Sequence, residues 1–274
     1  MTDRYAVFGN PIGHSKSPAI HAAFAAQARQ SLTYEAILAP LDGFAKAVAD
    51  FAAAGGRGAN VTVPFKEEAH RLATRLTPRA VRAGAVNTLS FETEGIVGDN
   101  TDGAGLVTDI DQNLAFPLAG RRVLLLGAGG AARGALGPLL DAGIAQLTVA
   151  NRSPGRAHEL ARLFAAHGNV VGCGLGEIAG SFDLVINATS ASLAGEALIL
   201  PAGTYAPGAL AYDMMYGPSG TPFLAAASRQ GAARIADGLG MLVEQAAEAF
   251  LHWRGIRPDT APVLADLRAR ISAP

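Results

Sequence analysis

The sequence of 274 residues predicts an α/β protein built from two lobes. Short apolar runs alternate with helical patterns along most of the chain, which is typical of sheets with parallel strand pairs. The alternation falls into two sets that meet near residues 98–103. A glycine-rich turn opens the second set, and the length is sufficient for one or two domains with a sizeable core.

The first set of elements covers the N-terminal third of the chain. Apolar runs predict strands at residues 5–8, 34–38, 59–63 and 86–91. The patterns between them predict helices at residues 18–28, 44–54 and 67–76. We therefore expect one α/β sheet in this lobe.

The second set begins at Arg121. It predicts alternating strands and helices at residues 123–126, 131–140, 147–150 and 156–166, then strands at 182–187, 209–213 and 234–236. A strongly amphipathic helix is expected from Met241 to Trp253. Because the second sheet is already complete at that point, we expect this helix to return to the first lobe. The two lobes should then face each other across a cleft.

The composition excludes several classes of protein. Half of the residues are apolar, and 22 basic against 23 acidic residues give a net charge of −1, so no overall field attracts nucleic acid or a membrane. Cys173 is the single cysteine, which excludes an internal disulfide. No apolar run approaches the length of a membrane span, and we expect a soluble, cytoplasmic protein. His14 and His21 lack partners at ligand spacing, so no metal site is expected.

The glycine-rich turn predicts a nucleotide site. It follows a buried strand and opens a helix with the pattern G-x-G-x-x-A. Gly127 permits the tight turn, Gly129 lets the backbone approach a pyrophosphate, and Ala132 allows close packing of the helix on the strand. The free N–H groups at the helix start attract phosphate. The alternative interpretation is an empty tight turn.

The end of the next strand favours NADP(H) over NAD(H). An acidic residue there usually holds the ribose 2′-hydroxyl of NAD. This chain instead has Asn151, Arg152, Ser153 and Arg156 in that region. A guanidinium group can bind a 2′-phosphate, which a carboxylate would repel. The alternative is that both arginines only cover a solvated helix start.

Two hydroxyls precede the first helix of the N-terminal lobe. Ser15 and Ser17 could bind a small anion together with the helix start. In a second interpretation Ser17 is the N-cap and Pro18 takes the first helical position. Both interpretations are compatible.

Further polar groups lie at the ends of predicted strands. Asn60 and Thr62 share one strand face by the period of two. Lys66 follows near a helix start, where a cation is unfavourable, so its position indicates a function beyond that of a surface lysine. Asn87 and Asp102 form a third polar pair. Asp102 could instead cap the helix from residue 103, and no sequence rule pairs it with Lys66.

Taken in order, the motifs of the chain resemble the shikimate dehydrogenase family. They are SKSP at 15–18, NVTVPFK at 60–66, GAVNT at 84–88, GDNTDG at 98–103, GAGGA at 127–131, NRS at 151–153, YDMMY at 212–216 and GLGMLVEQ at 238–245. The resemblance runs from about Tyr5 to Arg254. It implies an NADP-dependent enzyme of aromatic amino-acid biosynthesis that reversibly reduces 3-dehydroshikimate to shikimate.

The resemblance also implies the domains and the site. The substrate domain comprises residues 1–101 and 239–274, and a Rossmann-like, doubly wound NADP domain comprises residues 102–238. Positions that match the family's substrate site are Ser15, Ser17, Asn60, Thr62, Lys66, Asn87, Asp102, Tyr216 and Gln245. Positions that match its cofactor site are Gly127, Ala128, Gly129, Gly130, Ala131, Asn151, Arg152, Ser153, Arg156, Met214 and Gly238.

Three positions depart from the family pattern. Ser153 stands where Thr is frequent and keeps the hydroxyl. Pro78 stands where many members have an acidic residue near the cofactor, and it offers neither charge nor N–H. Glu244 lies at a variable position and receives no role.

The residues suit the chemistry of a ketone reduction. Hydride arriving at the ketone carbon creates an alkoxide, which an ammonium group can stabilise and protonate. We assign this role to Lys66, with Asp102 holding the amine and binding a substrate hydroxyl. The alternatives are a quinate or dual quinate/shikimate dehydrogenase and a catalytically silent NADP(H)-binding module. Retention of Lys66 with Asp102 argues against the silent module, and the sequence leaves both a monomer and a homodimer open.

Overall fold

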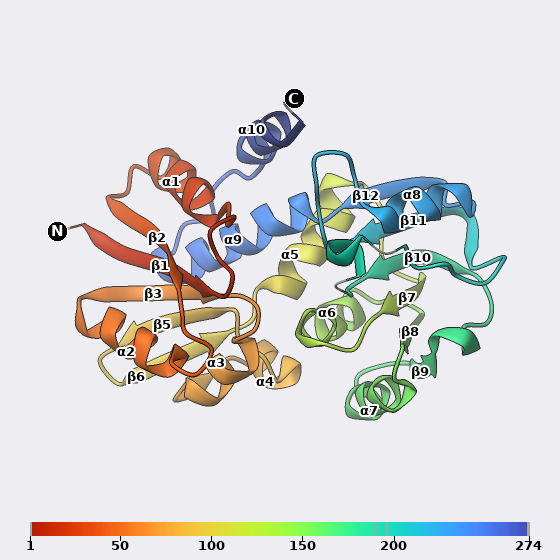
Figure 1. The fold of residues 1–274 in the computed structure, drawn as a ribbon, viewed down its shortest axis with the longest axis horizontal. Helices are drawn as coiled ribbons and strands as arrows, with labels where there is room; N and C mark the ends of the chain where they lie inside the picture. Colours follow the sequence, from red (N-terminus) through yellow and green to blue (C-terminus); the bar gives the residue numbers. More distant parts are fainter. Residues whose placement is uncertain (1, 190, 196, 273–274) are drawn as a thin grey trace.

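The computed structural model describes residues 2–189, 191–195 and 197–272. Two α/β lobes lie side by side, each built around a six-stranded sheet. The helices α5 (Asp102–Thr108) and α9 (Leu239–Arg254) run between the lobes (Figure 1). The predicted two-lobed α/β class is confirmed.

The sheet of the first lobe has the strand order β2-β1-β3-β5-β6-β4. Its strands are β1 (Asp3–Gly9), β2 (Leu32–Leu38), β3 (Gly56–Val61), β4 (Arg75–Leu76), β5 (Thr88–Glu92) and β6 (Gly95–Asp99). The strands β1, β2 and β3 are parallel, whereas β5 is antiparallel to both of its neighbours. Parallel strands need a long crossover, and only the turn at Thr93 and Glu94 joins β5 to β6, so this pair is a hairpin.

The helices of the first lobe differ from the sequence prediction at two places. They are α1 (Ser17–Gln27), α2 (Phe44–Ala53), α3 (Lys66–Leu72) and α4 (Pro78–Ala83). The helix predicted to reach residue 76 ends at Leu72, because Arg75 and Leu76 pair with β6 instead. Helix α4 was not expected; Thr77 caps it by accepting a hydrogen bond from the backbone N–H of Ala80 (3.3 Å).

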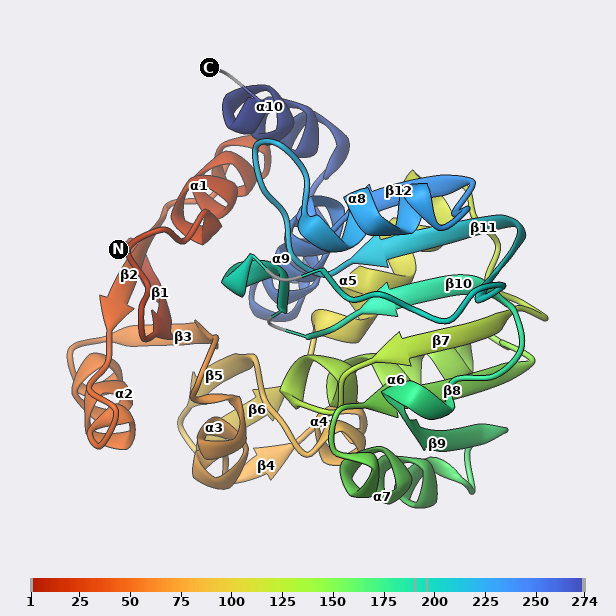
Figure 2. The same cartoon turned by 45° about the vertical axis from the view of Figure 1, so that its right-hand side comes forward.

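The second lobe contains a fully parallel sheet with the order β12-β11-β10-β7-β8-β9 (Figure 2). Its strands are β7 (Arg122–Leu126), β8 (Gln146–Asn151), β9 (Val170–Gly174), β10 (Phe182–Asn187), β11 (Tyr205–Asp213) and β12 (Arg234–Asp237), and its helices are α6 (Gly130–Asp141), α7 (Pro154–Phe164) and α8 (Pro222–Arg229). Counted from β7, this is the order 3-2-1-4-5-6 of doubly wound dinucleotide-binding sheets. The Rossmann-like prediction is confirmed.

The C-terminal helices return to the first lobe, as expected. The apolar face of α9 packs against α1 in a cluster that includes Ile20, Phe24, Val243 and Phe250. Helix α10 (Ala261–Ser272) joins the same cluster through Val263 and Leu267. Among the described residues no helix is both long and apolar enough to cross a membrane. The exact domain boundaries stay a prediction.

Helices α5 and α6 meet backbone to backbone where the lobes join. A Cβ atom on Gly103 of α5 would lie 2.1 Å from the carbonyl oxygen of Gly134 in α6. On its other side α5 meets α9, because a Cβ atom on Gly105 would lie 2.6 Å from the backbone nitrogen of Gln245. Glycine at both positions therefore sets how closely the three helices pack.

Replacing Gly103 by alanine should separate α5 from α6. Because backbone cannot yield as a flexible side chain does, we expect the unfolding free energy to fall by about 1–3 kcal/mol. Gly137→Ala in α6 is the matched control, because its Cβ would lie 3.5 Å from Arg82, an ordinary contact. The control should be neutral or stabilising by up to about 1 kcal/mol. Equal effects of the two variants in denaturant titrations would contradict this explanation.

Candidate active site

A lysine and an aspartate from different segments meet at the centre of the site. The Nζ atom of Lys66 lies 2.6 Å from Oδ2 of Asp102. The side chains are 17% and 9% exposed, so water screens the contact little. Each residue is the first of its helix, α3 and α5 respectively. The carboxylate of Asp102 offsets the unfavourable position of a cation at the start of α3.

The interpretation of Asp102 as a helix cap is wrong. Thr101 occupies the N-cap position of α5, and no side chain caps that helix start. Both carboxylate oxygens are engaged elsewhere: Oδ2 with Lys66, and Oδ1 as acceptor of a hydrogen bond from the amide of Asn87 (2.8 Å). The side chain of Asp102 is therefore not a cap, and it links Lys66 to Asn87.

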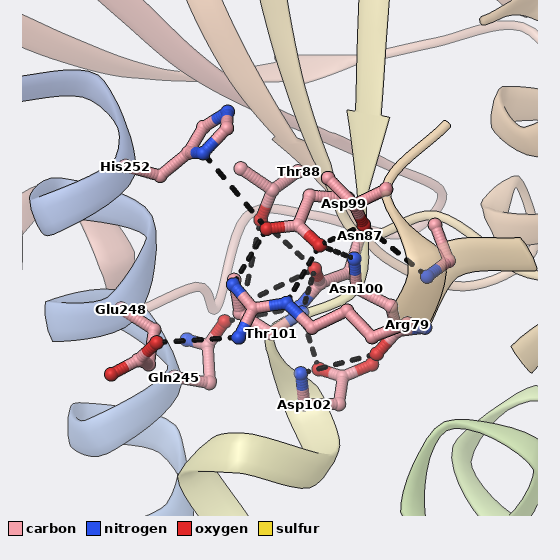
Figure 3. A network of polar contacts seen from close by, with 12 residues as sticks. Arg79, Asn87, Thr88, Asp99, Asn100, Thr101, Asp102, Gln245, Glu248 and His252 are labelled. Atoms are coloured by element: carbon pink, nitrogen blue, oxygen red, sulfur yellow. Dashed lines mark hydrogen bonds and ion pairs between the residues drawn. The ribbon is translucent and has the colours of Figure 1, made fainter. Parts of the chain in front are cut away.

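Two buried threonines that the sequence analysis missed hold Asn87 in place (Figure 3). The Oδ1 atom of Asn87 accepts hydrogen bonds from the backbone N–H of Thr101 (2.8 Å) and the hydroxyl of Thr88 (2.9 Å). Its Nδ2 group donates to the hydroxyl of Thr101 (2.9 Å) as well as to Asp102. Thr88 lies in the GAVNT motif and Thr101 in the GDNTDG motif, so these motifs were the sequence signal that could have identified them.

The side chain of Asn60 is engaged mostly inside the protein. Its Nδ2 group donates to the carbonyl of Asn87 and to the hydroxyl of Thr88, both at 3.1 Å. Its Oδ1 atom accepts a hydrogen bond from the hydroxyl of Tyr34 (2.7 Å), a partner that the sequence did not indicate. Since both amide hydrogens are occupied, Asn60 can offer a ligand only the remaining capacity of Oδ1.

The capping interpretation of Ser17 is also wrong. Lys16 is the N-cap of α1, and no side-chain bond caps that helix. The backbone N–H of Ser17 instead donates to Oγ of Ser15 (3.3 Å), and Ser17 is buried. The neighbouring Thr62 follows β3, and its N–H donates to the carbonyl of Phe8 at the end of β1 (2.9 Å).

Gln245 approaches the same site from α9. Its Oε1 atom lies 3.3 Å from Nδ2 of Asn87, and its Nε2 group donates to the carbonyl of Leu242 (2.8 Å). The close contact between α9 and Gly105 brings Gln245 to this place.

Tyr216 comes from the second lobe and faces α1. It lines a cavity of about 470 Å³ together with Lys16, the N-cap of α1, Ala19 of α1 and residues of α10. Burial, followed by the charge of Asp237, raises the pKa of the Tyr216 phenol. The group therefore stays protonated at neutral pH and can donate a hydrogen bond.

The glycine turn has the shape that a pyrophosphate requires. Gly127 has a φ of +111°, a conformation that favours glycine, and its N–H donates to the carbonyl of Ala150 (2.8 Å). A Cβ atom on Gly129 or Gly130 would meet no atom within 4 Å, so the space above the start of α6 is open. Gly129 is the N-cap without a side-chain cap, which leaves N–H groups for an anion. Ala128 and Ala131 lie in the same turn and helix start.

The residues expected at the ribose lie at the end of the adjacent strand β8. Asn151 ends this strand, and its Nδ2 group donates to the carbonyl of Ser153 (3.1 Å), the N-cap of α7. Arg152, Ser153 and Arg156 are exposed. Within the described part of the chain, neither arginine forms a salt bridge. This arrangement suits a 2′-phosphate.

Met214 and Gly238 meet beyond the ends of β11 and β12. The N–H of Met214 donates to the carbonyl of Asn187 (2.9 Å). A Cβ atom on Gly238 would lie 2.2 Å from the carbonyl oxygen of Met214, so only glycine fits there.

Pro78, which departs from the family pattern, is the first residue of α4, where its missing N–H costs nothing.

A fully parallel sheet with a glycine turn in the second lobe, together with a lysine–aspartate pair at the starts of α3 and α5, defines the class of dinucleotide-dependent oxidoreductases. Family models match the chain as "shikimate dehydrogenase substrate binding domain" (residues 7–89), "shikimate / quinate 5-dehydrogenase" (110–197) and "shikimate 5'-dehydrogenase C-terminal domain" (238–268). The chain belongs to the shikimate dehydrogenase family.

Relatives of known name and structure agree. The shikimate dehydrogenase (NADP(+)) of Dechloromonas aromatica is 67% identical over 274 residues and all of both chains; that of Aromatoleum aromaticum is 65% identical, with 98% of each chain covered. The crystal structure of an Ael1 enzyme from Pseudomonas putida is 50% identical, with a TM-score of 0.90 and coverage of 100% and 99%. That of the Thermus thermophilus shikimate 5-dehydrogenase with shikimate is 35% identical, with a TM-score of 0.86 and coverage of 99% and 100%.

A buried histidine behind the site should make the stability depend on pH. His21 is 1% exposed and stacks on Tyr34 with ring centroids 4.2 Å apart. Burial lowers the pKa of His21 to about 3, below its ordinary value of 6.5. In the unfolded chain His21 therefore binds a proton below pH 6.5, whereas in the folded chain it stays neutral down to about pH 3. The free energy of unfolding is therefore unaffected by His21 above pH 6.5 and decreases as the pH falls from 6.5 to about 3.

We expect His21→Phe to remove this dependence. Between pH 6 and 4, the unfolding free energy of the variant should fall less steeply than that of the unmodified protein, by up to about 1.4 kcal/mol per pH unit. Substitution of the exposed His158 by Gln is the control and should leave the slope unchanged. Parallel curves for His21→Phe and the unmodified protein, from urea titrations, would contradict the explanation.

Proposed function

We propose that this chain catalyses the reversible, NADPH-dependent reduction of 3-dehydroshikimate to shikimate, with Lys66 as the proton donor. The contact of 2.6 Å between Lys66 and Asp102 carries the proposal, because an ammonium and a carboxylate next to open polar groups suit this reaction. Membership of the family supports the activity, and the names of the relatives support NADP as the cofactor.

Lys66 handles the proton in this proposal. NADPH, when bound, supplies the hydride that reduces the ketone carbon. The Lys66 ammonium donates a proton to the oxygen of that carbon, and the resulting amine accepts one in the direction of oxidation. Asp102 binds the Lys66 ammonium through its negative charge and keeps Nζ in one position.

In this proposal further polar groups of the chain recognise the substrate. Ser15, Ser17, Thr62 and Tyr216 offer hydroxyls that can donate hydrogen bonds to the carboxylate or accept them from ring hydroxyls. Asn60 acts as an acceptor, since its amide hydrogens are engaged within the protein. Gln245 of α9 and Asn87, whose side chains approach to 3.3 Å, complete the set of substrate-binding groups in this proposal.

The cofactor lies over the second sheet in this proposal. Residues 127–131 hold the pyrophosphate through N–H groups at the start of α6. Arg152, Ser153 and Arg156 would bind the 2′-phosphate, and Met214 and Gly238 would hold the nicotinamide end. We infer a cytoplasmic site of action, and a homodimer stays a prediction. Quinate is the alternative substrate on the same scaffold.

Replacing Lys66 by alanine tests the central role. We expect kcat for shikimate oxidation with NADP⁺ to fall by roughly 10²- to 10⁴-fold, while KM changes little, because the proton transfer and not binding is lost. Lys46→Ala removes an exposed lysine of α2 and is the control. Steady-state rates with shikimate and quinate, each with NADP⁺ and NAD⁺, would establish the specificity in the same experiment. Near-normal kcat in Lys66→Ala would refute the assignment.

A further inference from the structure

A second buried carboxylate lies three residues before Asp102 and has no place in the mechanism above. Asp99 ends strand β6 and is 1% exposed. The guanidinium of Arg79 binds it with two hydrogen bonds, from Nε to Oδ1 (2.7 Å) and from Nη2 to Oδ2 (2.6 Å) (Figure 3). This planar, two-point geometry is specific to arginine.

Further donors satisfy the Asp99 carboxylate. Its Oδ1 atom accepts hydrogen bonds from the hydroxyl of Thr77 (2.5 Å) and the backbone N–H of Asn100 (2.7 Å). Burial acts to raise the pKa of Asp99, but these hydrogen bonds and the Arg79 charge outweigh it and hold the pKa below its usual value. The pair is thus ionised and neutral as a whole. Buried pairs of this kind add little stability compared with apolar packing, so its presence calls for another reason.

The bonds of Asp99 and Asn100 fix the turn that presents Asp102. The carbonyl of Asp99 accepts a hydrogen bond from the N–H of Asn87 (3.0 Å). The Asn100 side chain donates to the carbonyl of Ala85 (3.0 Å) and accepts from the N–H of Asp102 (3.2 Å). The whole turn from Asp99 to Asp102 is therefore tied to the segment from Ala85 to Asn87, which leads into β5.

Arg79 also links this turn to α9. Its Nη1 atom lies 3.3 Å from Oε2 of Glu248, one helical turn beyond Gln245. On the same helix, Nδ1 of His252 lies 4.0 Å from Oδ2 of Asp99. Figure 3 shows Arg79 between the Asp99 turn and α9. One guanidinium thus ties the turn that carries Asp102 to the helix that carries Gln245.

We propose that the Arg79–Asp99 pair positions the Asp102 carboxylate, so that Asp102 meets Lys66 and Asn87 at the same time. The proposal rests on the function of Lys66 and Asp102 stated above. Arg79 and Asp99 are positioning residues, which act through the turn and not on the substrate. Their loss lets the Asp102 carboxylate move relative to Lys66, which slows the proton transfer more than it weakens binding.

The test is a double-mutant cycle between Arg79 and Asp102. We expect Arg79→Gln to lower kcat on the order of 10- to 100-fold with little change in the KM for shikimate. In the Asp102→Asn background the same substitution should change kcat by no more than about twofold, because the carboxylate that Arg79 positions is already absent. Arg79→Lys keeps the charge without the two-point geometry and should restore kcat only in part.

Arg254→Gln is the matched control. Arg254, the last residue of α9, forms an ion pair with Asp3 at the start of β1 and has no contact with the Asp99 turn among the described hydrogen bonds and ion pairs, so its loss should leave kcat unchanged. Thermal unfolding shows whether each variant is folded at the assay temperature; if Arg79→Gln is not, Arg79→Lys replaces it in the cycle.

Three outcomes would overturn the proposal: additive losses in the cycle, an unchanged kcat for Arg79→Gln, or an equal loss in Arg254→Gln. Failure of the proposed function has a different signature, because Asp102→Asn alone would then keep the kcat of the unmodified protein.

Discussion

The contact between Lys66 and Asp102 is the interaction on which the rest of the structure depends. It joins the ammonium of Lys66 at the start of α3 to the carboxylate of Asp102 at the start of α5. A helix start is an unfavourable position for the cation and a favourable one for the anion. The carboxylate of Asp102 offsets the unfavourable position of the Lys66 ammonium and gives it a fixed partner at 2.6 Å. The hydrogen bonds of Asn87, Thr88 and Thr101 supply that fixation, so a largely neutral polar network surrounds one reactive pair.

The glycines of α5 connect this pair to the cofactor lobe. Gly103 brings α5 against α6, the helix whose start holds the glycine turn, and Gly105 brings it against α9. A side chain at either position would push the helices apart and would change the distance between Asp102 and the glycine turn. Backbone contacts of these two glycines thus set the distance between the helix that carries Asp102 and the helix that begins at the glycine turn.

Local patterns account for the parts of the site that the sequence could predict. The turn at Gly127 follows from a strand, a positive φ and a helix start, all within a few residues, and Lys66 stood out because a cation is unusual at a helix start. The pairing of Lys66 with Asp102 spans 36 residues and depends on tertiary packing. For the same reason the sequence cannot show that the side chain of Asn60 is engaged inside the protein. Of the two interpretations of Ser17, capping is wrong, because Lys16 takes the N-cap position.

The most direct measurement of the central claim is a high-resolution crystal structure with shikimate bound. Lys66 as proton donor and acceptor predicts that Nζ lies within hydrogen-bond distance, roughly 2.7–3.2 Å, of the hydroxyl oxygen on the carbon that is oxidised. Asp102 should then contact both Nζ and a hydroxyl of the substrate. A complex in which another side chain binds that hydroxyl, with Nζ beyond about 4 Å, would contradict the account.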